Sequence, residues 1–115
     1  MADDEVTRNL KGMDELDFAG WNSADWHGVF ARNHSDDVLV DVHGQGQTHG
    51  IQEHIDAMRA FVETTGGTPI QIMSPDQIRI RRVDVCVVGE FEGGGRMVTV
   101  AKWRDGAIAE EYIWM

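Results

Sequence analysis

Residues 96–115 constrain the fold of this chain more than any other stretch. Their sequence, RMVTVAKWRDGAIAEEYIWM, alternates apolar and polar positions on both sides of the pair Asp105-Gly106, which is a strong signal for a β-hairpin. One face of the first strand is predicted to carry Met97, Thr99, Ala101 and Trp103. The other face holds Val98 and Val100 among charged residues. Because both faces carry large apolar groups, we expect both to be covered and the hairpin to lie at the centre of a sheet.

The geometry of this turn decides which glutamate faces the interior. With a two-residue turn, Trp103 shares its face with Ile108, Glu110, Tyr112 and Trp114. With a three-residue loop that places Gly106 in a bulge, Trp103 shares its face with Ala107, Ala109, Glu111 and Ile113. A slip of one residue exchanges the faces of the whole strand, so both arrangements stay open. If one glutamate is inside, we favour Glu111.

Length and charge limit the classes of protein that the chain can belong to. Its 115 residues, 42% of them hydrophobic, predict a single domain over residues 1–115. The net charge of −10 argues against nucleic acid and anionic membrane as partners. The only cysteine, Cys86, is expected to be a small core residue. The amino terminus lacks the pattern of a signal peptide, so we expect a cytoplasmic protein.

Hydrophobic periodicity places helices before a run of strands. Helices are predicted over residues 4–19, from about residue 22 to just before His34, and over 51–64. Strands are predicted over 38–43, 69–73, 77–82 and 83–92, followed by the hairpin, with a loop at 44–47. This order predicts an α+β fold with the helices on one face of a mostly antiparallel sheet.

Three phrases of the sequence resemble a known superfamily. They are Ser35-Asp36-Asp37-Val38, Thr48-His49-Gly50-Ile51 and Lys102-Trp103-Arg104-Asp105-Gly106-Ala107-Ile108. In this order they resemble the nuclear-transport-factor-2-like superfamily, and within it the SnoaL-like polyketide cyclases. The resemblance implies a cone-shaped curved sheet that is packed against three N-terminal helices and encloses a mostly apolar pocket. It also implies general acid-base chemistry by a carboxylate or histidine on a carbonyl-bearing substrate.

The ketosteroid-isomerase members of the superfamily suggest further positions. Their base corresponds to Val42 when counted from Asp36-Asp37, and to Asp41 when counted from His49-Gly50. Their two oxyanion donors correspond to Phe18 and Thr99. Because a phenyl ring cannot donate a hydrogen bond, we do not expect a steroid-isomerase oxyanion hole.

The candidate catalytic residues are Asp41, His43 and Glu111. Asp41 and His43 share a strand face. They are interpreted either as a general base with a neighbouring proton carrier or as solvent-exposed residues at the end of a strand. Glu111 would lie near Thr99 and Trp103 if it faces inward; otherwise it is exposed or paired with a cation. The predicted ligand-binding residues are Phe18, Trp21, Trp26, Val42, Met58, Thr99, Ala101, Trp103 and Ile113.

No metal or other cofactor is expected. Asp41, His43, His49 and His54 could be ligands, but His49 and His54 are five positions apart and would not share a helix face. The sequence has no H-E-x-x-H motif and no cysteine pair. His27 and His34 are predicted to lie at the surface.

Three functions are compatible with these features. The leading hypothesis is an enzyme that performs acid-base chemistry on an apolar carbonyl-containing or polycyclic compound. The second is a non-catalytic module that binds a small apolar molecule, and the third is a dimerisation domain with a filled pocket. If Glu111 is inside, Tyr112 and Trp114 face outward with Val98 and Val100, which predicts a homodimer through the outer sheet face.

Overall fold

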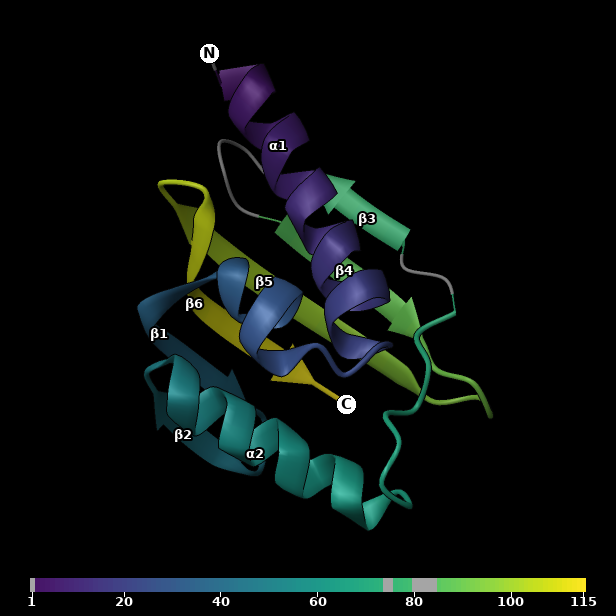
Figure 1. Ribbon diagram of the computed structural model, residues 1–115. Helices are drawn as coiled ribbons and strands as arrows, with labels where there is room; N and C mark the ends of the chain where they lie inside the picture. Colours follow the sequence, from purple (N-terminus) through teal and green to yellow (C-terminus); the bar gives the residue numbers. More distant parts are fainter. Residues whose placement is uncertain (1, 74–75, 80–84) are drawn as a thin grey trace.

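The computed structural model describes residues 2–73, 76–79 and 85–115 (Figure 1). The elements are, in order, α1 (Ala2–Glu15), η1 (Leu16–Trp21), η2 (Trp26–Phe30), β1 (His34–Val42), β2 (Gly46–His49), α2 (Ile51–Thr64), β3 (Asp76–Arg79), β4 (Val85–Glu90), β5 (Arg96–Arg104) and β6 (Ala107–Trp114). The segments η1 and η2 are π-helical. The predicted strands 77–82 and 83–92 extend into residues 80–84, which lie outside the described part.

The strands form one mixed sheet in the order β2-β1-β6-β5-β4-β3. β1 and β6 pair in parallel, whereas the other neighbours pair antiparallel. The hairpin β5–β6 therefore lies at the centre of the sheet, as predicted. Figure 1 shows the helical segments on one face of the curved sheet, with α1 over the β3–β4 end and α2 over β1 and β2. The predicted α+β fold is confirmed.

Two strand predictions were wrong. Residues 44–47 were predicted as a loop, but Gly46–His49 pairs with β1 as the edge strand β2. This strand is short and polar, so it lacks the alternation on which strand prediction relies. Residues 69–73 were predicted as a strand, but they contribute only one bridge, between Ile72 and Phe91.

The hairpin combines the two geometries that the sequence left open. Asp105 and Gly106 have φ angles of 54° and 84°, as in a two-residue turn. Trp103 accordingly pairs with Ile108, but the register then shifts. Beyond this bulge Ala101 pairs with Glu111, so Ile108 and Glu111 are both buried.

The core lies between the concave face of the sheet and the helices. In the second half of β1 the buried positions alternate, with Val38, Val40 and Val42 facing inward. The amphipathic stripe of α2 contributes Ile55 and Met58 to the same cluster.

The outer face of the hairpin is only partly covered by the described residues. Val98 and Val100 are half-buried, and Trp114 is 42% exposed. The expectation that both faces are covered is therefore met only in part by the described residues. Cys86, opposite Val100, is also only half-buried, and its predicted place in the core is corrected.

No helix among the described residues is both long and apolar enough to cross a membrane.

Candidate active site

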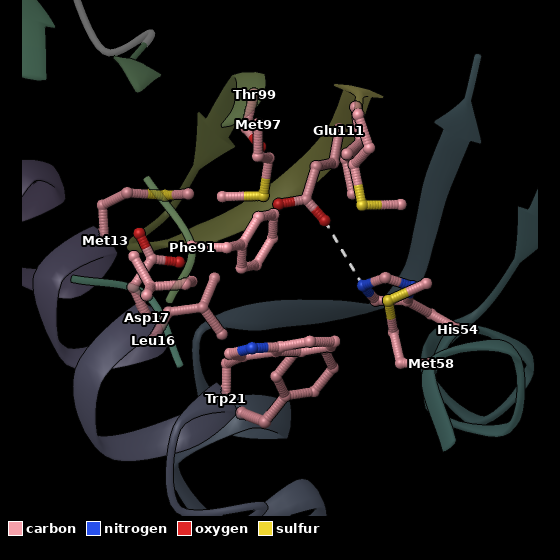
Figure 2. A pocket seen from close by; sticks show the side chains of 14 residues that line it. Met13, Leu16, Asp17, Trp21, His54, Met58, Phe91, Met97, Thr99 and Glu111 are labelled. Atoms are coloured by element: carbon pink, nitrogen blue, oxygen red, sulfur yellow. Dashed lines mark ion pairs between the residues drawn. The ribbon is translucent and has the colours of Figure 1, made fainter. Parts of the chain in front are cut away.

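A small cavity lies between η1, α2 and the inner face of β5 and β6 (Figure 2). It is lined by Met13, Leu16, Asp17, Trp21, Phe30, His54, Met58, Ile72, Phe91, Met97, Thr99, Glu111, Ile113 and Met115. About 40 Å³ is free for the centres of water-sized molecules, which is room for a few waters. The walls are mainly apolar, so each ionisable group that reaches the cavity does so at a cost in solvation.

Side-chain hydrogen bonds hold the segment of residues 70–72, from which Ile72 lines the cavity, against the end of η1. Trp21 Nε1 donates to the Ile70 carbonyl oxygen at 2.8 Å. The Asn22 side chain accepts from Ile72 N at 2.8 Å and donates to the Ile72 carbonyl oxygen at 3.1 Å. These contacts hold an otherwise irregular segment against the end of η1, so Ile72 closes one side of the cavity.

Asp17 reaches the cavity from η1 and is buried, with 4% of its surface exposed. No hydrogen-bond partner of its Oδ2 is present among the described residues. Burial, followed by the negative charges of Glu111 and Asp14, raises the pKa of Asp17 to about 8. At neutral pH this side chain is therefore a carboxylic acid that can donate a hydrogen bond.

The π-helical turn of η1 explains how a carboxyl group enters an apolar wall. Consecutive residues Leu16 and Asp17 are both buried, followed by Gly20 and Trp21. A Cβ on Gly20 would lie 3.1 Å from the Phe30 backbone, so glycine permits the close approach of η2. Single π-helical turns of this kind are frequent at functional sites.

Glu111 reaches the same cavity from β6, and two histidines contact it. Its Oε1 lies 3.3 Å from Nε2 of His34 and 3.3 Å from Nε2 of His54. Burial alone would raise the pKa of Glu111, but hydrogen bonds from His34 and His54 and their charge lower it below its ordinary range. Figure 2 shows the second carboxylate oxygen of Glu111 pointing into the hollow.

The hydrogen bonds of the histidines constrain where the protons lie. His34 Nδ1 lies 2.7 Å from the Phe30 carbonyl oxygen, so this nitrogen must carry a hydrogen. The contact between His34 Nε2 and Glu111 then needs one more proton, on either the ring or the carboxyl group. Burial lowers the pKa of His54 despite the opposing effect of Glu111. A neutral His54 with its hydrogen on Nε2 donates to Glu111 and leaves Nδ1, which has no partner among the described residues, unprotonated.

The structure brings five predicted site residues to the cavity. They are Trp21, Met58, Thr99, Glu111 and Ile113. Thr99 and Ile113 are directly opposite each other across the hairpin, so they line one patch of its inner face.

Asp41 and His43 lie elsewhere, and their predicted place in the pocket is corrected. Because Val40 and Val42 face inward, Asp41 points to the outer face, where Gln47 Nε2 donates to its carboxylate at 2.9 Å. His43 is exposed beyond the end of β1.

Five predicted ligand-binding residues also lie outside the cavity. Phe18 is 40% exposed on η1, and Trp26 packs edge-on against Trp21. Val42 and Ala101 are buried in the core. Trp103 is buried beneath α1, where a Cβ on Gly12 would lie 2.7 Å from its ring.

Asp17 was not singled out from the sequence, His34 was predicted at the surface, and His54 was considered only as a member of a metal set that was rejected. Asp17 lies four residues after Met13, and His54 lies four residues before Met58, so each falls on the apolar stripe of its helix. A polar residue on such a stripe is the signal that could have identified both. His34 was predicted at the surface because it begins a polar run, but β1 starts at His34 and its side chain is buried.

Glu111 and the two histidines that contact it also lie close enough together to hold a metal ion. One ligand atom from each of His34, His54 and Glu111 lies within 4.8 Å of the others. This set differs from the one weighed from sequence, with which it shares only His54.

Comparison with known proteins identifies the fold. Neither a family model nor a curated protein matches the sequence. A solved NTF2-like protein from Anabaena variabilis is 19% identical, with a TM-score of 0.74 over 96% of this chain and 88% of that chain. A candidate SnoaL-like polyketide cyclase from Jannaschia sp. is 18% identical, with a TM-score of 0.74 over 94% and 85% of the two chains.

A de novo designed protein with a curved β-sheet is also similar, at 16% identity and a TM-score of 0.71 over 95% of this chain and 85% of that one. The chain thus has the nuclear-transport-factor-2-like fold, and the predicted resemblance to SnoaL-like cyclases is confirmed at the level of fold. A designed neighbour illustrates that this fold does not determine the chemistry, so a function must be argued from the cavity.

Proposed function

We propose that this protein is an enzyme that moves protons on a compact, apolar, carbonyl-bearing compound. The observation that carries the proposal is geometric: two carboxyl groups from different elements, Asp17 and Glu111, reach one apolar cavity. Their surroundings displace the pKa of Asp17 upward and the pKa of Glu111 downward. Pairs of titratable groups displaced in this way are typical of an acid and a base that work together.

Asp17 is the proton donor in this proposal. A protonated carboxyl group donates a hydrogen bond to a carbonyl oxygen and stabilises the negative charge that develops when an adjacent C–H bond loses its proton. The apolar walls strengthen this interaction, because electrostatic effects increase where water is excluded.

Glu111 is the proton acceptor. Its carboxylate oxygen toward the cavity receives the substrate proton, while Oε1 remains with His34 and His54. These two histidines orient the carboxylate and can redistribute the proton. The lowered pKa of Glu111 favours its ionised form at neutral pH, where the raised pKa of Asp17 favours the protonated form, so a proton acceptor and a proton donor coexist there.

The size of the cavity favours a small substrate. Sites for drug-sized ligands occupy about 300–1,000 Å³, far more than the 40 Å³ present here. We therefore propose a substrate smaller than the polycyclic compounds considered from the sequence. The cavity is lined by four methionines, Met13, Met58, Met97 and Met115. Their flexible side chains permit modest adaptation to a ligand's shape.

Exchange of α-protons for deuterium tests the proposal whatever product the reaction forms. A panel of small ketones and enones is incubated with the protein in deuterated buffer, and NMR follows the loss of the α-proton signals. We expect the wild type to accelerate exchange of at least one compound, and Asp17→Asn and Glu111→Gln to lose that acceleration. Asp41→Asn and Glu110→Gln are matched controls, because both change a carboxyl group that does not line the cavity.

A non-catalytic binding module is the second candidate, and the small apolar cavity favours it. Trp21 lines the cavity and reports occupancy through its fluorescence. Quenching by panel compounds without exchange of any α-proton would support binding alone and contradict the catalytic proposal.

We also propose a homodimer through the outer sheet face. The supporting feature is a row of half-buried apolar side chains, Val98, Val100 and Tyr112, that ends at the exposed Trp114. Apolar patches of this kind commonly mark interfaces.

A further inference from the structure

The contacts of Glu111 allow a second chemical interpretation besides proton sharing. Three different elements, β1, α2 and β6, bring His34, His54 and Glu111 together, and all three side chains are buried. The three ligand atoms form a triangle. Two of its edges, the distances from the two histidine Nε2 atoms to Glu111 Oε1, are both 3.3 Å. All three ligand atoms lie within 4.8 Å of one another.

The two edges that involve Glu111 match the geometry of a tetrahedral metal site, whereas the two histidines, whose ligand atoms lie within 4.8 Å of each other, would draw closer to bind one ion. Zinc binds imidazole nitrogen and carboxylate oxygen at about 2.0–2.1 Å, which places neighbouring ligand atoms about 3.3–3.4 Å apart in a tetrahedron. Two histidines and one glutamate also form a recurrent donor set of zinc sites that keep a fourth position open. Glu111 therefore needs no movement to bind a metal ion together with either one of the histidines.

The hydrogen bond of His34 prepares its ring for a cation. Nδ1 donates to the Phe30 carbonyl oxygen at 2.7 Å, so the lone pair of a neutral ring lies on Nε2, toward Glu111. A backbone carbonyl in this role is a common outer-shell partner of metal-binding histidines, where it fixes both tautomer and orientation.

His54 is the weaker ligand. Its Nδ1 has no hydrogen-bond partner among the described residues, so a metal-bound ring would carry an unpaired N–H. Loss of an outer-shell partner typically lowers metal affinity about 10–100-fold. The affinity should therefore fall below that of a fully supported zinc site.

We propose that His34, His54 and Glu111 bind a zinc-like divalent cation, with the fourth coordination position open to the cavity. Imidazole and carboxylate donors suit zinc, cobalt and nickel, and the net charge of −10 attracts cations. This inference does not depend on the proposed function. If both proposals hold, the cation binds Glu111 Oε1 and the two histidine nitrogens, which otherwise share protons. The bound cation then suppresses the exchange reaction.

Cobalt(II) titration tests the site, because tetrahedral cobalt absorbs visible light far more strongly than hydrated cobalt. The titration uses chelator-treated protein that carries the substitution Cys86→Ser. This substitution removes the only thiol that could act as a ligand. We expect one cobalt per chain with a tetrahedral spectrum, displacement by zinc, and an affinity more than about 10-fold lower in Glu111→Gln and His54→Gln. His49→Gln is the matched control, since His49 is exposed and outside the cluster.

Folding of each variant is checked by circular dichroism, and zinc should raise the unfolding temperature of the parent and of His49→Gln by mass action. A spectrum of hydrated cobalt alone, equal affinity in folded Glu111→Gln, or loss of binding in His49→Gln would overturn the site. Asp17→Asn separates the two proposals, because it should abolish proton exchange and retain cobalt binding.

Discussion

The inner and outer faces of the central sheet carry the same types of side chain in different environments. On the outer face, Asp41 accepts a hydrogen bond from Gln47, and Glu110 accepts one from Tyr112. Inside the cone, Asp17 and Glu111 are buried among apolar groups, and their pKa values move in opposite directions. Residue type alone therefore does not identify the site; desolvation and the identity of the neighbours do.

Neutralising each glutamate gives the largest expected contrast between the faces. Glu111→Gln should reduce proton exchange on a responsive substrate by about 10²–10⁴-fold, the usual contribution of a general base. Glu110→Gln should leave the rate within about twofold of the wild type. Initial rates measured by NMR check this prediction, and equal effects of the two changes would remove the distinction between the faces.

Truncation of the same residues extends the contrast to stability. Glu111→Ala leaves two buried histidines without their partner and should lower the free energy of unfolding by about 3–5 kcal/mol. Glu110→Ala, at a partly exposed position, should change it by about 0.5 kcal/mol or less. Urea denaturation at pH 7 measures both. A Glu111→Ala variant as stable as the wild type would contradict the buried cluster.

Asp17 links the stability of the folded state to pH. Its pKa is about 8 in the folded state and 3.8 by default in the unfolded chain, so the folded state binds the proton more tightly. This contribution is fully present below pH 3.8 and is lost as pH rises toward 8. Relative to Asp17→Asn, the wild type should lose up to about 1.4 kcal/mol per pH unit in this window.

Urea denaturation at a series of pH values checks that slope. Asp41→Asn serves as the control for loss of a carboxyl group that does not line the cavity. A constant difference between wild type and Asp17→Asn from pH 4 to 8 would show that Asp17 is an ordinary carboxylate.

A substitution on the outer face should alter dimerisation without altering the reaction in the cavity. Trp114→Ser removes the most exposed apolar group of the β5–β6 hairpin, and we expect it to shift a dimer toward monomer without affecting proton exchange. Light scattering coupled to size-exclusion chromatography measures the mass. A wild-type protein that is already monomeric would contradict the proposed homodimer.

The sequence predicted the fold because its signals are local and repeated. Alternation and the Asp105-Gly106 pair identified the central hairpin, and the stripe of α2 gave that helix its bounds. The edge strand β2 could not be predicted, because an exposed polar strand has no buried face to leave a pattern.

The site was harder to predict because it depends on one bulge and on contacts between distant segments. The register shift after Trp103 decides that Glu111 is buried, and no turn rule places that bulge. His34 and Glu111 are separated by 77 positions, so their contact has no signature in sequence spacing. Asp17 lies on an apolar stripe and was overlooked among the polar residues of its helix. His54 also lies on such a stripe, but it was considered only as a member of a rejected metal set.

The measurement that tests the account most directly is the titration of the two cavity carboxyl groups by carbon-13 NMR. Assignments come from the Asp17→Asn and Glu111→Gln variants. We predict that Asp17 loses its proton near pH 8, whereas Glu111 stays ionised well below the usual range of glutamate. If both groups instead titrate near pH 4, like exposed carboxylates, the cavity does not hold an acid and a base, and the central claim fails.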